Sequence, residues 1–94
     1  MPPIEFEWDE GNLAKSKLKH DISPKEAELS FSDKDKVIFY DRKHSGDEIR
    51  YICIGRSEGQ ILTSYFTTRN CRVRIIGTRK ANNSEKIRYE TFKQ

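Results

Sequence analysis

Residues 68–80 hold five basic side chains and no acidic one, which makes this stretch the clearest candidate for chemistry in the 94-residue sequence. The five are Arg69, Arg72, Arg74, Arg79 and Lys80. Because strand side chains alternate between faces, Arg72 and Arg74 should lie side by side, opposite the apolar Val73 and Ile75. The last two basic residues follow this strand, where a turn toward a C-terminal helix would aim both at the same surface. One guanidinium group can donate two parallel hydrogen bonds to two oxygens of the same phosphate. The stretch therefore predicts a phosphodiester clamp, a site where several arginines bind the phosphate of a nucleic acid.

Two interpretations of this basic stripe are open: it binds a polyanion, or its charges only keep the outer face of a sheet soluble. Residues 1–35 hold five Lys against nine Asp and Glu, whereas residues 36–94 hold thirteen Lys and Arg against six acids. Such a charge asymmetry bears on partners and association rates. We therefore expect nucleic acid as the first class of partner and an acidic protein as the second.

The pattern of the chain predicts one α+β domain over residues 1–94. Alternating apolar and acidic residues over 4–8 indicate a strand, and a thin apolar stripe from about residue 10 to 20 indicates a helix. Ser23, Pro24 and Glu26 are typical of the start of a second helix. This helix should bury Ala27, Phe31 and either Leu29 or Ser30.

Four β-rich runs then follow at residues 37–40, 51–54, 61–67 and 73–76, and short connections predict that they pair as an antiparallel meander. The run Asn82-Asn83-Ser84-Glu85 caps a last helix that reaches about Phe92, anchored by Ile87 and by Phe92 or Tyr89. The expected order is βααββββα, an antiparallel sheet with the helices packed on one face.

The composition limits the class of protein further. Only 34% of the residues are hydrophobic, so we expect one modest core and also self-association as a homodimer. The sequence has no apolar run of about 20 residues and no basic and apolar leader, which predicts a cytoplasmic protein without membrane contact. Cys53 and Cys71 lack the spacing of a zinc site or a disulfide framework. We expect them to be buried and reduced, and we expect no metal.

Motifs along nearly the whole chain carry a resemblance to a known family. They are Phe6-Glu7-Trp8-Asp9, Lys19-His20, Ile22-Ser23, Glu26-Ala27, Phe31, Asp33, Arg50, Ile54-Gly55, Arg74-Ile75-Ile76, Arg79, Ala81, Glu85 and Tyr89-Glu90. In this order and spacing they resemble the BrnT family, the toxins of BrnT/BrnA toxin–antitoxin pairs and relatives of the RelE-like ribonucleases. The resemblance implies a RelE-like fold, RNA cleavage without metal or cofactor, and a BrnA-like antitoxin whose dimer binds DNA.

Metal-free RNA cleavage needs one group that accepts the proton of the attacking 2′-hydroxyl and one that donates to the leaving 5′ oxygen. It also needs cations that balance the charge of the phosphorane. Arg74 and Arg79 are the first candidates for the cations, and Arg56 is a third that could instead pair with an acidic residue. Lys19 and His20 are candidates for the base or acid, although His20 at a helix end would equally satisfy backbone carbonyls.

The other candidates also have two roles open to them. Tyr89 could place its hydroxyl on the scissile phosphate or pack its ring on the sheet. Trp8 could stack on a base or belong to the core or an interface, which is more usual for a lone tryptophan in a small domain. The remaining residues expected to contact RNA are Arg50, Arg69, Arg72 and Lys80.

A non-catalytic module that binds RNA or an antitoxin through the same face is the alternative function. Motifs of other enzyme classes are absent from the sequence, which has no P-loop, GxSxG, HExxH or dinucleotide fingerprint. An acidic, partly disordered segment of the antitoxin would mask Arg72, Arg74 and Arg79 and would compete with RNA.

Overall fold

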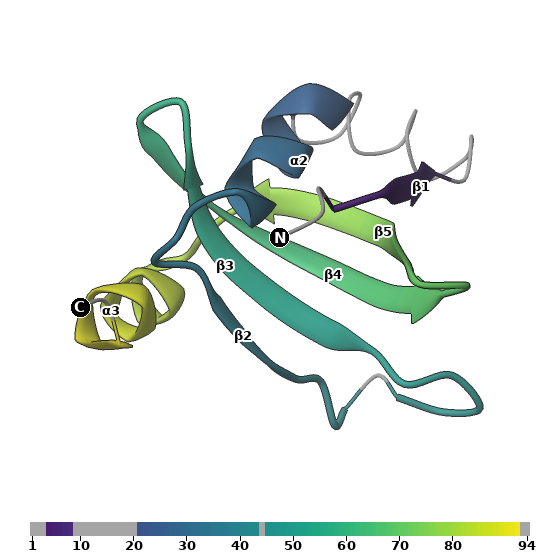
Figure 1. Ribbon diagram of the computed structural model, residues 1–94. Helices are drawn as coiled ribbons and strands as arrows, with labels where there is room; N and C mark the ends of the chain where they lie inside the picture. Colours follow the sequence, from purple (N-terminus) through teal and green to yellow (C-terminus); the bar gives the residue numbers. More distant parts are fainter. Residues whose placement is uncertain (1–3, 9–20, 44, 93–94) are drawn as a thin grey trace.

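The computed structural model describes residues 4–8, 21–43 and 45–92, and within them each predicted strand and both predicted helices form (Figure 1). The helix predicted over about residues 10–20 lies outside the described residues. In chain order the elements are β1 Phe6–Trp8, α2 Pro24–Phe31, β2 Val37–Tyr40, β3 Tyr51–Ser57, β4 Gln60–Arg69, β5 Arg72–Lys80 and α3 Asn83–Phe92. The α+β class is therefore confirmed.

The five strands form one sheet in the order β1-β5-β4-β3-β2. Strands β2 to β5 are antiparallel neighbours, as their short connections predicted. Strand β1 pairs with β5 in parallel, so the prediction of a wholly antiparallel sheet is wrong and the sheet is mixed. A short hairpin forces two strands to be antiparallel, whereas β1 joins β5 from the far end of the chain and no hairpin fixes its direction.

Two tight hairpin turns set the register of the three central strands. Ser57 lies opposite Gln60, and the two residues between them, Glu58 and Gly59, have φ angles of 47° and 83°. Between β4 and β5 the turn residues Asn70 and Cys71 have φ angles of 53° and 63°. Two positive φ angles are typical of the type I′ turn, whose twist matches that of the strands. Cys71 is therefore exposed at a turn, contrary to its predicted burial, whereas Cys53 is buried as predicted.

A bulge in β5 changes which side chains share a face. Phe66 pairs with Ile75 and the neighbouring Tyr65 pairs with Gly77, so Ile76 has no partner in β4. An unpaired residue reverses the alternation beyond it. Arg79 consequently lies on the same face as Arg74, although an unbroken strand would place these two residues on opposite faces.

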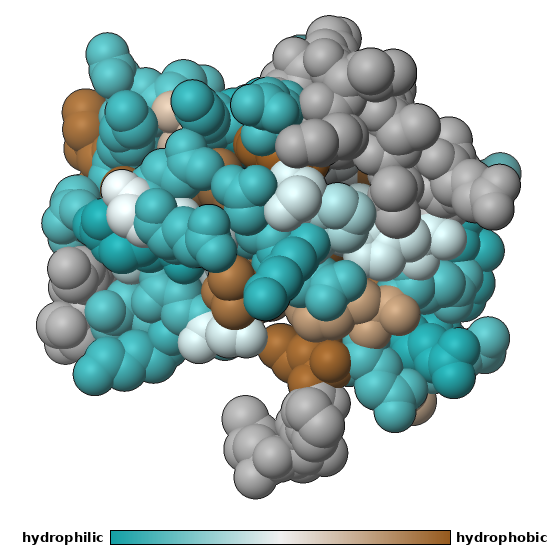
Figure 2. Space-filling model, turned by 90° about the horizontal axis from the view of Figure 1, so that it is seen from above, coloured by the Kyte–Doolittle hydropathy of each residue, from teal (hydrophilic) through white to brown (hydrophobic). Residues whose placement is uncertain are grey.

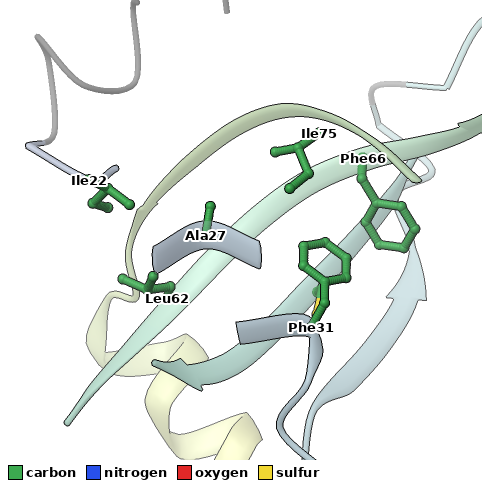
Figure 3. Close-up of a cluster of buried hydrophobic side chains, with 7 residues drawn as sticks. Ile22, Ala27, Phe31, Leu62, Phe66 and Ile75 are labelled. Carbon is green, nitrogen blue, oxygen red and sulfur yellow. The ribbon is translucent and has the colours of Figure 1, made fainter. Parts of the chain in front are cut away.

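Helix α2 covers one face of the sheet and supplies the centre of the core. Its N-terminus has the predicted capping box, in which Ser23 Oγ accepts a hydrogen bond from the Glu26 N–H and the Glu26 carboxylate accepts one from the Ser23 N–H. The Phe31 ring packs edge-on against the Phe66 ring at 5.1 Å between centroids. Ile22, Ala27, Cys53, Leu62 and Ile75 complete the cluster shown in Figure 3. Of the two alternatives, Ser30 is buried and Leu29 is exposed.

Helix α3 lies on the other face of the sheet, at one end (Figure 1). The Arg88 guanidinium lies 4.3 Å from the centroid of the Phe39 ring, and Arg79 bonds to Glu85. By the strand register, Phe39 and Arg79 both point away from α2. The prediction that the helices pack on one face is therefore wrong. Tyr89 is the buried anchor of α3, whereas Ile87 and Phe92, proposed as anchors, are exposed.

The outside of the molecule is mostly hydrophilic on the side that bears α2, as Figure 2 shows. No helix within the described ranges is long and apolar enough to cross a membrane.

Candidate functional site

Five arginines share the face of the sheet that α3 partly covers, which we call the α3 face. Each forms an ion pair with a glutamate of the same chain. The pairs are Arg56 with Glu90, Arg69 with Glu48, Arg72 with Glu5, Arg74 with Glu7, and Arg79 with Glu85. The predicted stripe therefore exists and includes Arg79, but the protein partly neutralises it with its own carboxylates.

Strand β1 and the residue before it supply the partners of Arg72 and Arg74. Glu7 lies directly opposite Arg74 in the parallel register, and the Glu5 carbonyl accepts a hydrogen bond from the Val73 N–H. Arg74 Nη1 lies 2.7 Å from Glu7 Oε1, and the side chains are only 20% and 28% exposed. Arg72 and Glu5 are 3.2 Å apart and are both more than half exposed. Because water screens exposed charges, the Arg74 pair is the stronger of the two.

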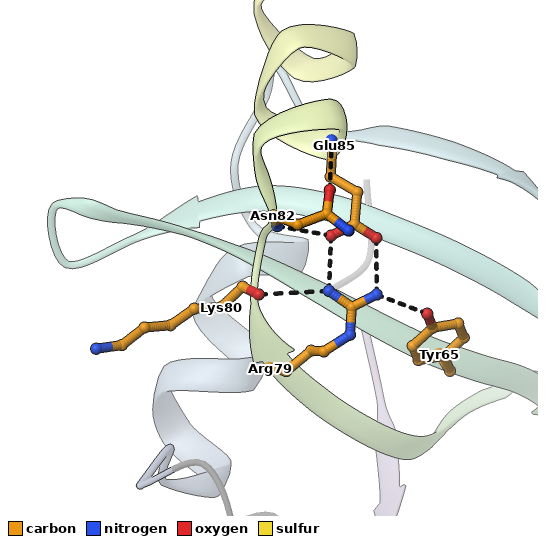
Figure 4. Close-up of polar contacts among 5 residues, drawn as sticks. All are labelled: Tyr65, Arg79, Lys80, Asn82 and Glu85. Carbon is orange, nitrogen blue, oxygen red and sulfur yellow. Dashed lines mark hydrogen bonds and ion pairs between the residues drawn. The ribbon is translucent and has the colours of Figure 1, made fainter.

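Arg79 is the most tightly held cation of the α3 face (Figure 4). Its two terminal nitrogens donate to both carboxylate oxygens of Glu85, at 2.7 and 2.8 Å, and one of them also donates to the Tyr65 hydroxyl at 2.8 Å. The same carboxylate accepts from the Asn82 N–H and thereby caps α3. These bonds raise the pKa of Arg79. Burial alone would raise the pKa of Glu85, but the hydrogen bonds from Arg79 and Asn82 lower it.

Tyr65 is the residue of this site that the sequence did not single out for chemistry. The guanidinium group of Arg79 lies 5.5 Å from the centroid of the Tyr65 ring and donates to the Tyr65 hydroxyl. Both the ring and the hydroxyl therefore contact the cation. Gly77 lies opposite Tyr65 in β5 and has open space where a side chain would begin. Strand alternation puts Thr63, Tyr65 and Thr67 of β4 on one face, and the register with β5 shows that Arg79 lies on the same face.

A second polar cluster ties α3 to the sheet. Asp33, just after α2, accepts hydrogen bonds from the Tyr89 hydroxyl at 2.5 Å and from the Arg56 N–H at 2.8 Å. Burial, followed by the bond to Asp33, raises the pKa of Tyr89 to about 12. Burial would raise the pKa of Asp33, but the bonds from Tyr89 and from the backbone of Arg56 and Asp35 outweigh it and lower that pKa. Since Tyr89 is 1% exposed, its position fits the packing role.

Asp33 should make the free energy of unfolding depend on pH in the acidic range. A carboxyl group whose folded pKa is lowered stabilises the protein above its unfolded value, 3.8, and this contribution is lost as pH falls through the lower folded value. We expect the free energy of unfolding of the wild type to fall more steeply below about pH 4 than that of Asp33→Asn. Urea unfolding at a series of pH values measures this. Tyr89→Phe should remove only part of the dependence, and equal slopes for wild type and Asp33→Asn would contradict the role of Asp33.

Two of the other predicted site residues, Trp8 and Lys80, lie on the opposite face of the sheet, the α2 face. Lys19 and His20 lie outside the described residues. Trp8 lies on the α2 face, packs against the core and donates to Glu28 at 2.7 Å. Lys80 is exposed on the α2 face, because the bulge places Arg79 on the α3 face and the next strand residue points the other way. Figure 4 shows the Lys80 side chain pointing away from the site. Arg50 is half-buried just before β3.

Among residues 4–8, 21–43 and 45–92, no three His, Cys, Asp or Glu side chains are grouped so that they could hold a metal ion.

The fold and the site thus define a class of protein: a small α+β domain whose sheet carries a row of ion-paired arginines on the α3 face. Residues 8–85 match the family model of the ribonuclease toxin BrnT of type II toxin–antitoxin systems. The chain belongs to this family, which confirms the resemblance and implies a ribonuclease toxin with an antitoxin partner. A search of curated proteins found no significant match.

Proposed function

We propose that this toxin cleaves RNA without a metal ion on the α3 face, with Arg79 as the principal cation. The observation that carries the proposal is the position of Arg79, which lies in the acid-free stretch and is fixed by Glu85 and Tyr65 on the face that also bears Arg74. A cation that is already oriented needs no reorganisation when charge develops on a phosphorane. We also propose that the fold is RelE-like, with a first helix over about residues 10–20.

The residues would divide the chemistry between them. Arg79 and Arg74 balance the phosphorane charge, while Tyr65, which accepts a hydrogen bond from Arg79, lies where its hydroxyl can contact a phosphate oxygen. Arg56 packs over the Tyr89 ring at 5.9 Å and extends the cationic surface toward α3. Lys19 and His20 remain our candidates for the transfer of protons to and from the sugar oxygens.

The carboxylates of the α3 face act as internal competitors of the substrate. A phosphate and a carboxylate bind a guanidinium through the same paired geometry. RNA that binds Arg72 or Arg74 therefore exchanges with Glu5 or Glu7, and affinity reflects the difference between the two contacts.

Incubation of the purified protein with single-stranded RNA in EDTA tests the proposal. We expect cleavage that leaves 2′,3′-cyclic phosphate ends, because the attacking group is the neighbouring hydroxyl, and RNA binding that weakens steeply with salt, by a logarithmic slope of about −0.7 per phosphate contact. Cleavage that stops in EDTA and returns with added Mg²⁺ would contradict the metal-independent mechanism. Binding without any cleavage would favour the alternative function, a module that holds RNA or the antitoxin.

Removal of one internal competitor should strengthen RNA binding. In Glu7→Gln the carboxylate opposite Arg74 loses its charge, and we expect RNA to bind about three- to tenfold more tightly, since a partly buried pair is worth about 1 kcal/mol. Fluorescence anisotropy with labelled RNA measures the change. Glu5→Gln is the matched control, and because its pair with Arg72 is more exposed its effect should be smaller. Unchanged affinity in Glu7→Gln would show that RNA does not use Arg74.

A further inference from the structure

The two edges of the sheet differ in how they are protected. At one edge β1 has only three residues, and Glu7 within it is charged. At the other edge β2 consists of four uncharged residues, Val-Ile-Phe-Tyr, and the side chains of Ile38 and Tyr40 are 47% and 49% exposed. Proteins commonly block an edge with charges, bulges or proline because its open backbone groups pair with other strands. Strand β2 has none of these features.

The backbone of β2 has two residues whose polar groups point outward. The Asp41 N–H donates to the Arg50 carbonyl, so Asp41, and by alternation Phe39 and Val37, direct their backbone groups toward β3. Ile38 and Tyr40 therefore direct their N–H and C=O groups away from the sheet. Within residues 4–8, 21–43 and 45–92 these groups have no hydrogen-bond partner. The same two residues also expose their side chains, so one strip offers both hydrogen bonds and apolar contact.

The exposed charges at the two ends of β2 are basic: Lys34 precedes the strand, and Arg42 and Lys43 follow it. Lys36 and the acidic residues Asp33 and Asp35 are half-buried, and Asp41 is 5% exposed. A segment with acidic residues at its ends would meet favourable charges at both ends of β2.

From these features we propose that the outer edge of β2 is the docking site of an extended segment of the antitoxin, with apolar residues at alternate positions and acidic residues at its ends. The segment adds a sixth strand beside β2, pairs with the backbone of Ile38 and Tyr40, and places its apolar side chains against theirs. The proposal rests on membership of a toxin–antitoxin family, and it does not depend on cleavage at the α3 face.

A second copy of this chain fits the edge less well. If two copies paired in antiparallel fashion with Ile38 opposite Tyr40, Asp35 would lie opposite Lys43, but Lys36 of one copy would lie opposite Arg42 of the other, nearer the centre of the paired strands. With Ile38 opposite itself, Lys34 would lie opposite Arg42. Like charges directly opposite each other destabilise a pair of strands.

The test uses the full chain and a synthetic peptide of five alternating valines and threonines with two glutamates at each end. Hydrogen exchange by NMR should show the amides of Ile38 and Tyr40 protected at least tenfold by saturating peptide. The amides of Val37, Phe39 and Asp41 should be slow with or without peptide, because they already bond within the sheet. A peptide that docks on a face of the protein instead would protect none of the outward amides and would overturn the proposal.

Two matched controls distinguish pairing with the edge of β2 from non-specific binding of the peptide. The same peptide with lysines at its ends should bind at least tenfold more weakly, and Ile38→Lys should weaken binding of the acidic peptide by at least tenfold. Ile87→Lys makes the same change at a more exposed isoleucine of α3 and should leave binding within twofold. Equal binding of both peptides, or equal effects of both substitutions, would overturn the proposal.

Two further measurements complete the test. Sedimentation shows whether a second copy of the chain occupies the edge, and RNA cleavage shows whether this proposal stands apart from the cleavage mechanism. Sedimentation should show that free wild type and Ile38→Lys have the same mass, whereas a dimer that Ile38→Lys dissociates would give the edge to a second copy and overturn the proposal. RNA cleavage by Ile38→Lys should equal that of the wild type, because Ile38 lies on the α2 face. Absence of cleavage in the wild type itself would refute the proposed mechanism and leave the docking site intact.

Discussion

Arg79→Ala should lower the rate of RNA cleavage in EDTA by about 10²–10³-fold, the usual loss when one fixed donor to developing charge is removed. The substitution also removes the ion pair and two-pronged hydrogen bond to Glu85, whose side chain is only 15% exposed. Because solvent screens part of this interaction, we expect a loss of about 1–3 kcal/mol in the free energy of unfolding. Single-turnover cleavage and urea unfolding measure the two effects separately.

A matched variant distinguishes a cation in the reaction from a tether for α3. Glu85→Gln breaks the same ion pair, but it leaves the Arg79 charge in place and keeps an oxygen that can accept from the Asn82 N–H. We expect Glu85→Gln to lose a comparable amount of stability and less than about tenfold in cleavage rate. If both variants lose cleavage equally, Arg79 serves to hold α3 and does not act on the phosphate.

Gly55→Ala should be the most disruptive small substitution in the core. A Cβ atom at Gly55 would lie 2.2 Å from the Ser30 carbonyl oxygen and 3.0 Å from its carbon, both of which are backbone atoms of α2. Since neither can rotate away, the helix must move off β3, and we expect a loss of about 3 kcal/mol in the free energy of unfolding. Thermal and urea unfolding of the purified variant measure it.

Gly77→Ala provides the matched control for this prediction. No atom lies within 4 Å of a Cβ built at Gly77, so the same added methyl group should change stability by less than about 0.5 kcal/mol. A similar loss in both variants would show that the close approach of α2 to β3 is not what requires glycine at residue 55. Because Gly77 lies opposite Tyr65, the control also tests whether the open surface beside the tyrosine is needed for RNA binding.

Local patterns in the sequence predicted the elements well, since local physics determines them. Ser23 and Asn82 mark the starts of α2 and α3 because their side chains accept bonds from backbone N–H groups that a helix end leaves free. Alternating apolar residues and two short turns predicted the strands from β2 to β5. The anchor of α3 was harder to predict, because the short helix has three apolar side chains and contacts with the distant residues Asp33 and Arg56 select Tyr89.

The sequence predicted the positions of part of the arginine stripe correctly, but it did not predict the glutamates that pair with the arginines. The acid-free stretch placed Arg72 and Arg74 on the face opposite the core, as the structure shows. The partners of these arginines are Glu5 and Glu7, which lie near the other end of the chain. Strand alternation gives the face of each residue, but it does not say which distant strand will be its neighbour. The sequence alone therefore did not show that glutamates neutralise the stripe, because this follows from the pairing of β1 with β5.

Short-range patterns and the order of motifs were enough to predict the α+β class, the hairpins, the helix caps and membership of the BrnT family. The pairing of strands in the folded protein was needed to show that Arg79 shares a face with Arg74 while Lys80 does not. The cause is the unpaired Ile76, which reverses the alternation of β5. A bulge arises from the pairing of two whole strands and from the packing of both faces, so the residues around Ile76 do not specify it on their own.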